Sequence, residues 1–498
     1  MREADTVTKT GRGRRGRKVL VIGGGIAGLA AAHRLLDGSE RGGQVHVTVL
    51  EADERLGGKL HTGEIAGARV DLGAESMLAR RPEAVGLARE VGLGDRLQPP
   101  STATASIWTR GSLRPMPKGH VMGVPGTAEA LEGVLSDEGL RRIRRDDHLP
   151  PTHLGEDVSV GRYVAARLGR EVVDRLVEPL LGGVYAGDAD LISMRSAVPQ
   201  LFEEAARHVS LTEAVRAIQE RAAANQQTGP VFMGIEGGIG TLPGAVADAV
   251  RAKGGEILLG ERATTLTTRD GLWQLRTESG RTFEADQVIV ALPAPAAASL
   301  LRTASPMASQ ELRRIEYASM ALITMAFRKA EAEGLPEGSG FLVPPVDGHT
   351  IKAATFASRK WGWIAEQNPD LLVVRTSVGR YGDEKDLARD DNDLVDLSRQ
   401  DLREATGLNA APVAAHVTRW KDGLPQYPVG HAARVDRIRE HIAAVPGLAV
   451  CGAAYDGVGI PACIASAYAA VDILGGDPTA LDELKADPVQ SMHGGAGE

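Results

Sequence analysis

The stretch KVLVIGGGIAGLAAAHRLL, from Lys18 to Leu36, decides the fold. It begins with a short aliphatic run typical of a strand, continues through glycines and ends in an Ala- and Leu-rich segment with helical spacing. Gly23, Gly25 and Gly28 fit the pattern G-x-G-x-x-G between that strand and that helix. The pattern predicts a tight turn at Gly23, approach of a pyrophosphate at Gly25 and close helix-to-strand packing at Gly28. The alternative is a glycine-rich turn without a ligand.

The next predicted strand, VHVTVLEA from Val45 to Ala52, favours the ligand-binding interpretation. Glu51 closes this strand about 20 residues after the glycines, where an acid can bond the ribose hydroxyls of an adenosine. An acid at this place also disfavours a 2′-phosphate. Strand, glycines, helix and acid in this order predict an α/β dinucleotide-binding domain.

A second glycine-containing segment, ADERLGGKLHT, follows this acid directly. Its glycines, Gly57 and Gly58, allow the backbone to contact a longer cofactor, which favours FAD over NAD. Arg55 and Lys59 flank them. A solvated basic turn is the alternative, and it is the simpler interpretation of Lys59 taken alone.

The sequence closes with another loop-to-helix passage, CGAAYDGVGIPACIASAYAAVDIL from Cys451 to Leu474. Pro461 suits the first turn of the predicted helix. The amides and dipole at the start of this helix can face the pyrimidine edge of a flavin, where negative charge develops on reduction. A capped structural helix is the alternative. Together the two ends of the chain predict one long cofactor that is held at both of its ends.

The order of these segments predicts an α/β protein with a discontinuous, Rossmann-like FAD-binding domain, an inserted α+β substrate domain and a helical subdomain. A length of 498 residues agrees with more than one domain. We expect a disordered tail over residues 1–17, an FAD-binding domain over 18–105, 230–300 and 430–475, a substrate-binding and helical domain over 106–229 and 301–429, and a flexible C-terminal tail over 476–498.

Composition excludes several classes of protein. The chain is 43 % hydrophobic and 24 % charged, and we expect no transmembrane segment because its apolar runs are interrupted by Gly, Arg or Asp. Two cysteines exclude a disulfide scaffold and favour a cytoplasmic setting. Peripheral association of the protein with a membrane remains an alternative. A net charge of −8 argues against nucleic acid as a partner. We expect no metal site.

With these motifs in view, the chain resembles the amine-oxidase-like flavoproteins and, within them, the porphyrinogen oxidases. The broad resemblance rests on VIGGGIAGLAAAHRL, LEADERLGGKLHT and CGAAYDGVGIPACIASA. The narrower one rests on DLGAESMLARRPEAVGLARE, LRPMPKGHVMGVP, EPLLGGVYAGDADLISMRSAVPQL, GGIGTLPGAV and GLPQYPVGH, which look most like coproporphyrinogen III oxidases of Gram-positive bacteria. Relatives often carry Gly-Pro where this chain has Gly73-Ala74, and Arg-Lys where it has Arg80-Arg81.

The resemblance implies an FAD-dependent oxidoreductase that acts on CH–CH bonds of coproporphyrinogen III, in haem biosynthesis, with O2 as acceptor and H2O2 as product. It also implies which residues meet the cofactor. Those near the adenosine and phosphates are Gly23, Gly25, Ile26, Ala27, Gly28, Glu51, Ala52, Arg55, Gly58 and Lys59, with Ala263 beside the adenine and Gly452, Val458, Gly459 and Ile460 toward the flavin.

The substrate of such an enzyme carries propionates, and their carboxylates require local cations in a net-negative chain. Our candidates are Arg81 first, then Arg80, Lys118 and His120, with Arg110 and Arg114 nearby in sequence. Solvated charged faces are the commoner use of such runs. Aromatic and Met side chains that could pack on a tetrapyrrole, but that are more often core residues, are Tyr185, Met194, Trp361 and Trp363.

Two alternatives to this function remain. Protoporphyrinogen oxidase belongs to the same class of enzyme but has only two propionates to bind. A flavin-containing porphyrin carrier that passes its ligand to a metal chelatase without turnover belongs to a different class. We assign no catalytic residue, because the flavin performs the oxidation and the protein orients the substrate.

Overall fold

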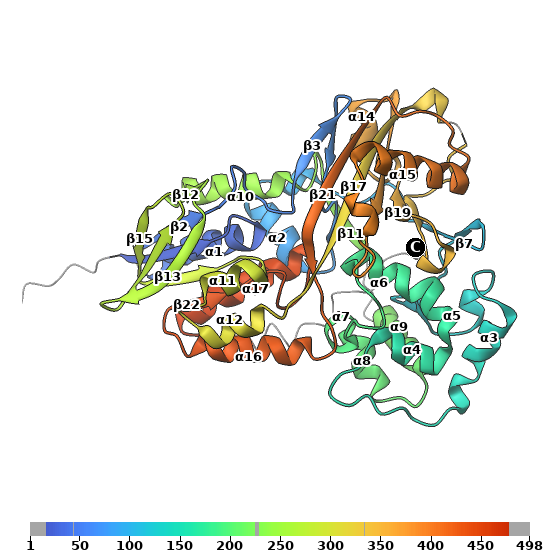
Figure 1. Ribbon diagram of the computed structural model, residues 1–498, viewed down its shortest axis with the longest axis horizontal. Helices are drawn as coiled ribbons and strands as arrows, with labels where there is room; N and C mark the ends of the chain where they lie inside the picture. The colour runs from blue at the N-terminus through green and yellow to red at the C-terminus, as the bar shows by residue number, and fades with distance from the viewer. Residues whose placement is uncertain (1–15, 43, 225–228, 333, 478–498) are drawn as a thin grey trace, which may run out of the picture.

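The structure, a computed structural model, describes residues 16–42, 44–224, 229–332 and 334–477. Figure 1 shows an elongated molecule with a parallel sheet toward one end, and a large, mainly antiparallel sheet above a helical lobe at the other. The N-terminal tail expected over residues 1–17 stays a prediction; at its end, Arg17 pairs with Val45 in the first strand. The remainder of both expected tails, residues 1–15 and 478–498, lies outside the described residues.

The parallel sheet is assembled from segments that are far apart in the sequence. All of its neighbouring strands run parallel. Because parallel strands need crossover connections, the strands can come from both ends and the middle of the chain. In spatial order they are β12 (Glu256–Leu258), β2 (Val45–Leu50), β1 (Arg17–Ile22), β16 (Gln287–Val290) and β22 (Leu448–Val450).

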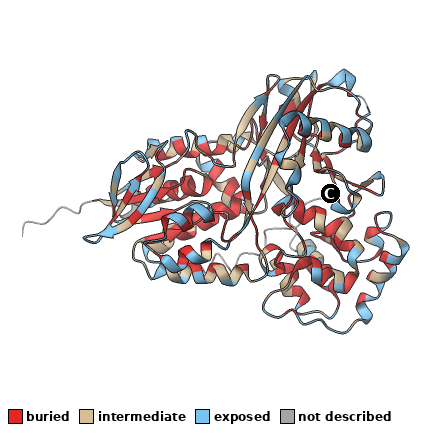
Figure 2. Ribbon diagram, in the orientation of Figure 1, coloured by how far each residue is buried: buried red, intermediate tan, exposed pale blue. Residues whose placement is uncertain are grey.

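Both faces of this sheet are buried, as the continuous aliphatic run of β1 requires. Val19 and Val21 pack against the helices of one face, and Leu20 and Ile22 pack against those of the other. The first face carries α1 (Ile26–Gly42), α10 (Thr241–Ala252) and α17 (Ile460–Gly475), and the second carries α11 (Ala294–Leu300), α12 (Pro306–Leu312), α16 (His431–Ala443) and the antiparallel strands β13 (Ala263–Arg269), β14 (Leu272–Thr277) and β15 (Thr282–Ala285). Figure 2 shows this double-sided burial as a red interior. The predicted α/β class is confirmed.

The second large sheet has seven strands and supports the opposite end of the molecule. Helix α15 (Asp391–Thr406) covers one of its faces and contributes Leu394 and Leu402 to their common core. Asp390 caps this helix by accepting the amide of Asp393 at 2.9 Å. The spatial order of the strands is β21 (Ala414–Pro425), β17 (Tyr317–Arg328), β20 (Leu371–Val378), β19 (Ile351–Thr355), β18 (Gly340–Leu342), β7 (Ser106–Thr109) and β8 (Ser112–Pro115).

The helical lobe lies between residues 120 and 224 and has its own apolar core. It comprises α3 (Asp137–Arg144), α4 (Val160–Leu168), α5 (Arg170–Val172), a π-helical turn (Val173–Val177), α6 (Glu178–Tyr185), α7 (Met194–Ala197), α8 (Pro199–Ala205) and α9 (Leu211–Ala224), with the short strands β9 (His120–Val121) and β10 (Val124–Pro125).

Short elements connect these parts of the molecule. They are β3 (Thr62–Ile65), β4 (Ala68–Asp71), β5 (Met77–Leu78), α2 (Pro82–Glu90), β6 (Leu97–Gln98), β11 (Phe232–Ile235), α13 (Ala357–Lys360) and α14 (Gly362–Gln367). The expected division into two discontinuous domains stays a prediction. Within the described ranges, the helices all fall short of the length and apolar character needed to cross a membrane.

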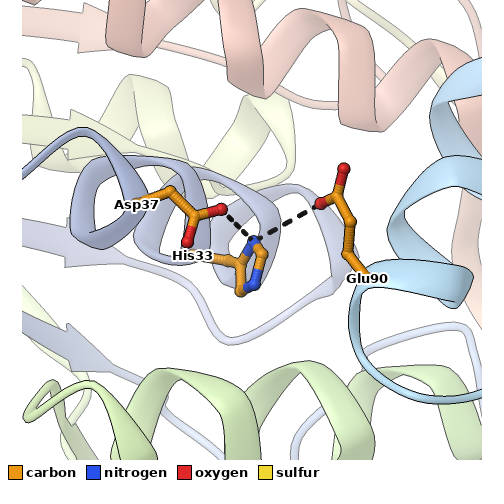
Figure 3. A group of neighbouring side chains, drawn as sticks. All are labelled: His33, Asp37 and Glu90. Atoms are coloured by element: carbon orange, nitrogen blue, oxygen red, sulfur yellow. Dashed lines mark ion pairs between the residues drawn. The ribbon is translucent and has the colours of Figure 1, made fainter. Parts of the chain in front are cut away.

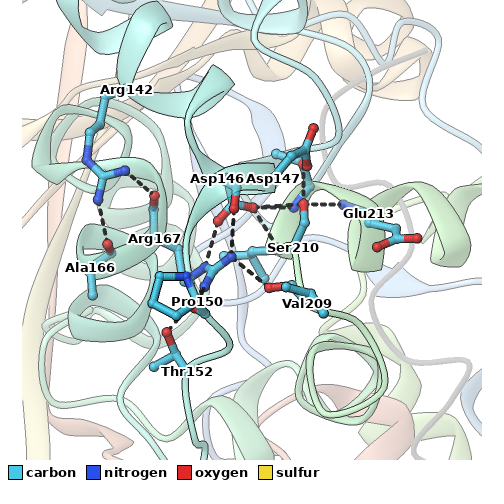
Figure 4. Close-up of polar contacts among 12 residues, drawn as sticks. Arg142, Asp146, Asp147, Pro150, Thr152, Ala166, Arg167, Val209, Ser210 and Glu213 are labelled. Carbon is cyan, nitrogen blue, oxygen red and sulfur yellow. Dashed lines mark hydrogen bonds and ion pairs between the residues drawn. The ribbon is translucent and has the colours of Figure 1, made fainter.

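A buried ion pair organises the helical lobe (Figure 4). Arg167 and Asp146 are 1 % and 0 % exposed, and Arg167 Nε lies 2.6 Å from Asp146 Oδ1. The other carboxylate oxygen accepts the Ser210 hydroxyl and the amides of Leu211 and Thr212, at the start of α9. The guanidinium also donates to three backbone carbonyls, those of Asp146, Pro150 and Val209. One pair therefore joins α4, α9 and the loop between α3 and α4.

We expect Arg167→Met to destabilise the protein by about 3–5 kcal/mol, because it leaves the Asp146 carboxylate buried without its cation. Urea unfolding of the two purified proteins, followed by circular dichroism, measures this loss. Arg141→Met is the matched control: its side chain is 57 % exposed and pairs with Glu138 at the surface. This control should change stability by no more than about 1 kcal/mol. Equal effects of the two substitutions would contradict the structural role of the buried pair.

Candidate functional site

The first glycine loop has the geometry that its pattern predicts. Gly23 has a φ of +112°, and a Cβ at this position would lie 2.4 Å from the Ala291 carbonyl oxygen. A Cβ on Gly28 would lie 1.9 Å from the Gly23 carbonyl oxygen. At Gly25, by contrast, a Cβ would meet no atom within 4 Å. Gly28 is therefore required by the packing of α1 on the end of β1, and Gly23 by the contact of β1 with the segment after β16. Gly25 instead leaves space at the start of α1 next to Ile26, and a cofactor phosphate would fit there.

Glu51 is held against this loop. Its Oε2 accepts the amide of Gly24 at 2.7 Å, so the carboxylate at the end of β2 lies beside the glycines. The carbonyl of Glu51 accepts the amide of Glu261 at 2.8 Å. This bond brings the start of β13, at Ala263, next to Glu51 and Ala52. These residues are thus gathered on one side of the glycine loop, where the sequence predicted the adenosine end of the cofactor.

The second glycine segment packs directly on the first. The amide of Gly57 donates to the carbonyl of Gly24 at 2.9 Å, and a Cβ on Gly58 would come within 3.8 Å of the Gly25 Cα. Gly57 and Gly58 both have positive φ angles, +97° and +56°. Arg55 lies over its own loop and donates to the Gly58 carbonyl at 2.7 Å. The loop that contains Gly57 and Gly58 therefore borders the open space beside Gly25.

Lys59 turns from this loop toward the C-terminal helix and is half-buried, not solvated. Burial lowers the pKa of its ammonium group, and the nearby Cys463 and Asp422 side chains oppose this shift. A Cβ on Gly73 would lie 2.0 Å from the Lys59 carbonyl oxygen, so the backbone here also requires a glycine. The segment after Glu51 thus reaches the start of α17.

The C-terminal loop completes the site. Gly452 has a φ of +121°, and a Cβ on it would approach Ala27 of α1 to 4.0 Å, so the loop after β22 lies beside the first glycine loop. Gly452 also donates its amide to Ser466 at 3.1 Å, which fixes this loop on α17. Gly459 occupies the N-cap of α17, and the nearest atom to a Cβ there is 3.8 Å away. The amides at Ile460 and beyond therefore begin a helix with an open end.

The thiol near this helix start, that of Cys463, is buried. Burial raises the pKa of Cys463 to about 12, although Lys59 and Arg81 oppose the shift. Burial also raises the pKa of Cys451. A thiol held neutral in this way is a poor nucleophile. The two cysteines are therefore packing residues, and Lys59 and Arg81 converge on the start of α17.

The structure places the four candidate substrate cations in different surroundings. Arg81 is 8 % exposed at the start of α2 and pairs with Glu83. Arg80 precedes it and is half-buried. Lys118 is exposed, and His120 is a half-buried residue of β9 whose Nδ1 accepts the amide of Gly123 at 3.1 Å. Arg81 therefore acts on Cys463 in the first turn of α17, whereas His120 belongs to the hairpin of the helical lobe and Lys118 shortly precedes it.

Other sequence candidates prove to be structural. Arg110 pairs with Glu171 inside the helical lobe, and Arg114 donates to the Thr109 carbonyl. The four aromatic and Met candidates are core residues, which is the interpretation that the sequence favoured: Tyr185, Met194, Trp361 and Trp363 are each at most 3 % exposed.

A buried network that the sequence analysis missed joins the segment after Gly73 to the seven-stranded sheet. Glu75 lies 2.6 Å from Lys360 Nζ and 2.8 Å from Arg375 Nη1. Arg375 also donates to the Gly73 carbonyl at 2.8 Å. Although burial alone would raise the pKa of Glu75, the charges of Lys360 and Arg375 outweigh it and lower the pKa to about 2. This carboxylate fixes the segment that leads to Arg81.

Two clusters in the described chain have the composition of a metal site. One comprises His349, Asp401 and Glu404, and the other lies at the junction of α1, α2 and α10 (Figure 3). His33 Nδ1 lies 3.5 Å from Asp37 and 3.9 Å from Glu90. Lys253 already pairs with Asp37. Burial and the charge of Lys253 lower the pKa of His33, against the effect of Glu90. Because an ammonium group occupies the place of the cation, we assign no metal there.

Comparisons with known proteins agree with this geometry. The profile of the family described as flavin containing amine oxidoreductase matches residues 26–474. The chain belongs to the flavin-containing amine oxidoreductase family. The protein is therefore a flavin-dependent oxidoreductase.

Within the family, two curated relatives are named coproporphyrinogen III oxidase. That of Mycobacterium tuberculosis is 38 % identical over 457 residues, which cover 91 % of this chain and 96 % of the relative. That of Bacillus subtilis is 34 % identical over 462 residues, covering 91 % and 97 %. A crystal structure of a protein named putative protoporphyrinogen oxidase, from an Exiguobacterium species, is 33 % identical with a TM-score of 0.82, covering 93 % of this chain and all of that chain.

More distant members of the fold include a cyclohexylamine oxidase from Brevibacterium oxydans. It is 16 % identical, with a TM-score of 0.67 over 93 % of this chain. At this identity the likeness concerns the fold alone.

The open position at Gly25 gives a test of flavin binding. We expect Gly25→Val to fold, because a Cβ at this position would meet no protein atom within 4 Å, but to lose bound flavin because its side chain fills the space beside the start of α1. Gly28→Val is the contrasting variant and should fail to fold, because its Cβ would collide with the Gly23 carbonyl. Circular dichroism and the visible absorbance of purified protein give the two readouts. A yellow Gly25→Val protein with unchanged flavin content would exclude a cofactor at this position.

The pKa of Glu75 predicts how acid affects stability. A carboxylate whose folded pKa is about 2, below its ordinary value of 4.5, stabilises the fold above pH 4.5 and loses this effect as the pH falls toward 2. We expect Glu75→Gln to lower stability at pH 7 by roughly 3 kcal/mol and to weaken the loss of stability between these pH values. Urea unfolding at several pH values measures both effects.

The matched control for this prediction is Glu278→Gln. The Glu278 side chain is 71 % exposed and lies 3.5 Å from Arg262. It should change stability by less than about 0.5 kcal/mol at every pH. The account of Glu75 fails if its variant and this control have parallel profiles.

Proposed function

We propose that this protein is a coproporphyrinogen III oxidase that uses FAD and O2 and produces coproporphyrin III in haem biosynthesis. The observation that carries the proposal is the name shared by relatives that are 34 % to 38 % identical over 91 % of the chain. The geometry supports it, because two glycine loops from opposite ends of the sequence border one continuous site.

The proposal of FAD in particular rests on the length of this site. Glu51 and Ala263 are gathered on one side of the first glycine loop, and the open helix start at Gly459 lies beyond Lys59. A dinucleotide can span this arrangement with its adenosine at Glu51, its phosphates at Gly25 and its isoalloxazine at Val458, Gly459 and Ile460. FMN lacks the adenosine and would leave the Glu51 end without a ligand.

The overall reaction removes six hydrogen atoms from coproporphyrinogen III. It requires three two-electron oxidations, each of which reduces one O2 to H2O2 and takes up the two protons released from the substrate. When bound, FAD supplies the hydride-accepting centre for each oxidation. The chain binds and orients the macrocycle and keeps water from the reacting face.

The residues of this chain contribute to orientation and electrostatics. The amides at the start of α17 are positioned to stabilise negative charge next to Ile460. Arg81, which converges on the same helix start, is our first candidate for a propionate, and Arg80, Lys118 and His120 are further candidates. We assign no residue as the acceptor of the substrate protons.

The same geometry is compatible with protoporphyrinogen IX as the substrate. The names of two similar proteins favour this alternative. A bovine relative named protoporphyrinogen oxidase is 29 % identical over 493 residues, and the solved structure with a TM-score of 0.82 carries a similar name. The number of carboxylates separates these substrates, since coproporphyrinogen has four and protoporphyrinogen has two. We also propose that the product passes to a metal chelatase. We propose a cytoplasmic location for the protein, with peripheral contact to a membrane.

Aerobic assays with both porphyrinogens test this function. We expect the flavin-loaded protein to increase the Soret absorbance with coproporphyrinogen III far faster than autoxidation, with three H2O2 formed per porphyrin, and to give a higher kcat/KM than with protoporphyrinogen IX. The reverse preference would favour the second substrate. Rates equal to autoxidation with both, while porphyrin binds, would instead identify a carrier.

A further inference from the structure

A buried lysine in the seven-stranded sheet has no role in the function described so far. Lys352 lies in β19 and is 6 % exposed. Ile351 and Ala353 both pair with β20, but Lys352 between them does not, so it is the extra residue of a β-bulge. Bulges redirect a side chain and are frequent next to active sites. Ile351 and Ala354 belong to the core under α15, so the bulge interrupts the regular alternation of this strand.

The charge of Lys352 is not compensated. Among the described residues, no carboxylate or other side chain bonds its ammonium group, and the charge that acts on it most is another cation, Arg380. Burial first, and then Arg380, lower the pKa of Lys352 to about 7. An isolated buried ammonium is costly, which proteins tolerate where a ligand provides the opposite charge.

Arg380 is attached to the same backbone as Lys352. It is 8 % exposed, and its Nη2 donates to the Val343 carbonyl at 2.9 Å. The amide of Val343 in turn donates to the Lys352 carbonyl, also at 2.9 Å. Within the described chain, Nε and Nη1 of Arg380 have no hydrogen-bond partner. Arg380, which follows β20, and Lys352, in β19, are thus attached to the same residue, Val343, just after β18.

The one acid that acts on Arg380 from the facing helix is Glu178, at the start of α6. Its carboxylate accepts the amide of Ala189 at 2.7 Å. Burial raises the pKa of Glu178 to about 7; Asp188 and Asp190 add to this shift, and the Ala189 amide and Arg380 oppose it. Asp383, in the loop after Arg380, also acts on this guanidinium, and within the described chain neither its carboxylate nor that of Glu178 is hydrogen-bonded to it.

This cluster lies at the junction of the flavin site and the helical lobe. Helix α6 packs against β19 (Figure 1). Tyr381, which follows Arg380, donates its amide to the Ala186 carbonyl at 2.7 Å. The adjacent Tyr185 packs against the ring of Tyr427, at 5.7 Å between centroids. Tyr427 donates its hydroxyl to the Ala453 carbonyl, in the loop that leads to α17.

Two aliphatic side chains define the same junction. Val458 of the C-terminal loop and Leu342 of β18 both pack against the core of the helical lobe. Leu342 pairs with Ala353, the residue after Lys352. The strand next to Lys352 and the C-terminal loop therefore both pack against the core of the helical lobe, which connects the cation pair to the proposed flavin site through this lobe.

We propose that Lys352 and Arg380 form a carboxylate-binding site that receives a propionate of the porphyrinogen. The guanidinium provides a directional pair of donors, and the ammonium provides a point charge on the bulge. This inference rests on the proposed function, since it identifies residues that bind the substrate. It also explains why a soluble domain keeps an unpaired lysine in its interior.

Binding of coproporphyrin III, the tetracarboxylate product, to full-length flavin-loaded protein tests the site without turnover. We expect Lys352→Met to raise the Kd at least about tenfold relative to wild type, because a charge-assisted hydrogen bond is lost. Fluorescence titration measures the Kd. The tetramethyl ester of coproporphyrin III, in the same detergent, should bind both proteins equally, because it has no carboxylates.

The control and a second variant make the result specific. Lys385→Met removes an ammonium whose side chain is 77 % exposed, 3.6 Å from Asp383, and should leave the Kd unchanged. Lys352→Arg keeps the charge and should retain affinity within a few-fold of wild type. Wild-type protein that does not bind coproporphyrin III would overturn the proposed function together with this inference. Wild-type binding with an unchanged Kd in Lys352→Met would overturn this inference alone.

Thermal unfolding without porphyrin provides a second readout, which distinguishes a role of Lys352 in binding from a role in the fold. We expect Lys352→Met to raise the Tm, because it removes a buried charge that only the ligand neutralises. A lysine that served packing or folding would instead produce a lower Tm in this variant. A lower Tm together with an unchanged Kd would assign Lys352 to the fold and remove it from the substrate site.

Discussion

The close contact of two backbones at Gly23 and Gly28 is the constraint on which the rest of the structure depends. A Cβ on Gly23 would lie 2.4 Å from the Ala291 carbonyl oxygen, so glycine at position 23 lets the end of β1 meet the segment after β16. A Cβ on Gly28 would lie 1.9 Å from the Gly23 carbonyl oxygen, so α1 can lie this near to the end of β1 only with glycine at position 28. This approach brings the start of α1 to the end of the parallel sheet, where the carboxyl ends of such strands form ligand sites. The packing of the protein does not require a glycine at position 25, so the space beside Gly25 remains available to a cofactor.

A site at this edge can recruit segments from the whole chain. The amide of Gly57 bonds the carbonyl of Gly24, Gly452 lies beside Ala27, and Glu261 bonds Glu51. These contacts join residues that are up to several hundred positions apart, because the parallel strands β1, β2, β12, β16 and β22 end on the same side. The helical lobe packs against Val458 of the C-terminal loop, where we propose that the substrate meets the flavin.

The sequence predicted the parts of the site that follow local patterns. Strand, glycine loop, helix and acid occur within a short window, so the roles of Gly23, Gly28 and Glu51 could be derived from spacing alone. The partners of Glu75 could not, since Arg375 lies 300 residues away and the pair exists only after β20 packs against the segment after Gly73. Lys352 was missed for a related reason. A lysine in a strand usually faces solvent, and only the bulge and the covering helix α6 reveal that this one is buried.

Our central claim is that one dinucleotide contacts the first glycine loop and the start of α17 at the same time. Hydrogen exchange of the flavin-stripped protein, compared with the protein reloaded with FAD or with FMN, tests it most directly. The account predicts that FAD slows amide exchange both around Gly24 to Gly28 and around Gly457 to Cys463, whereas FMN slows it chiefly around the second segment. Protection by FAD at only one of the two segments would contradict the account.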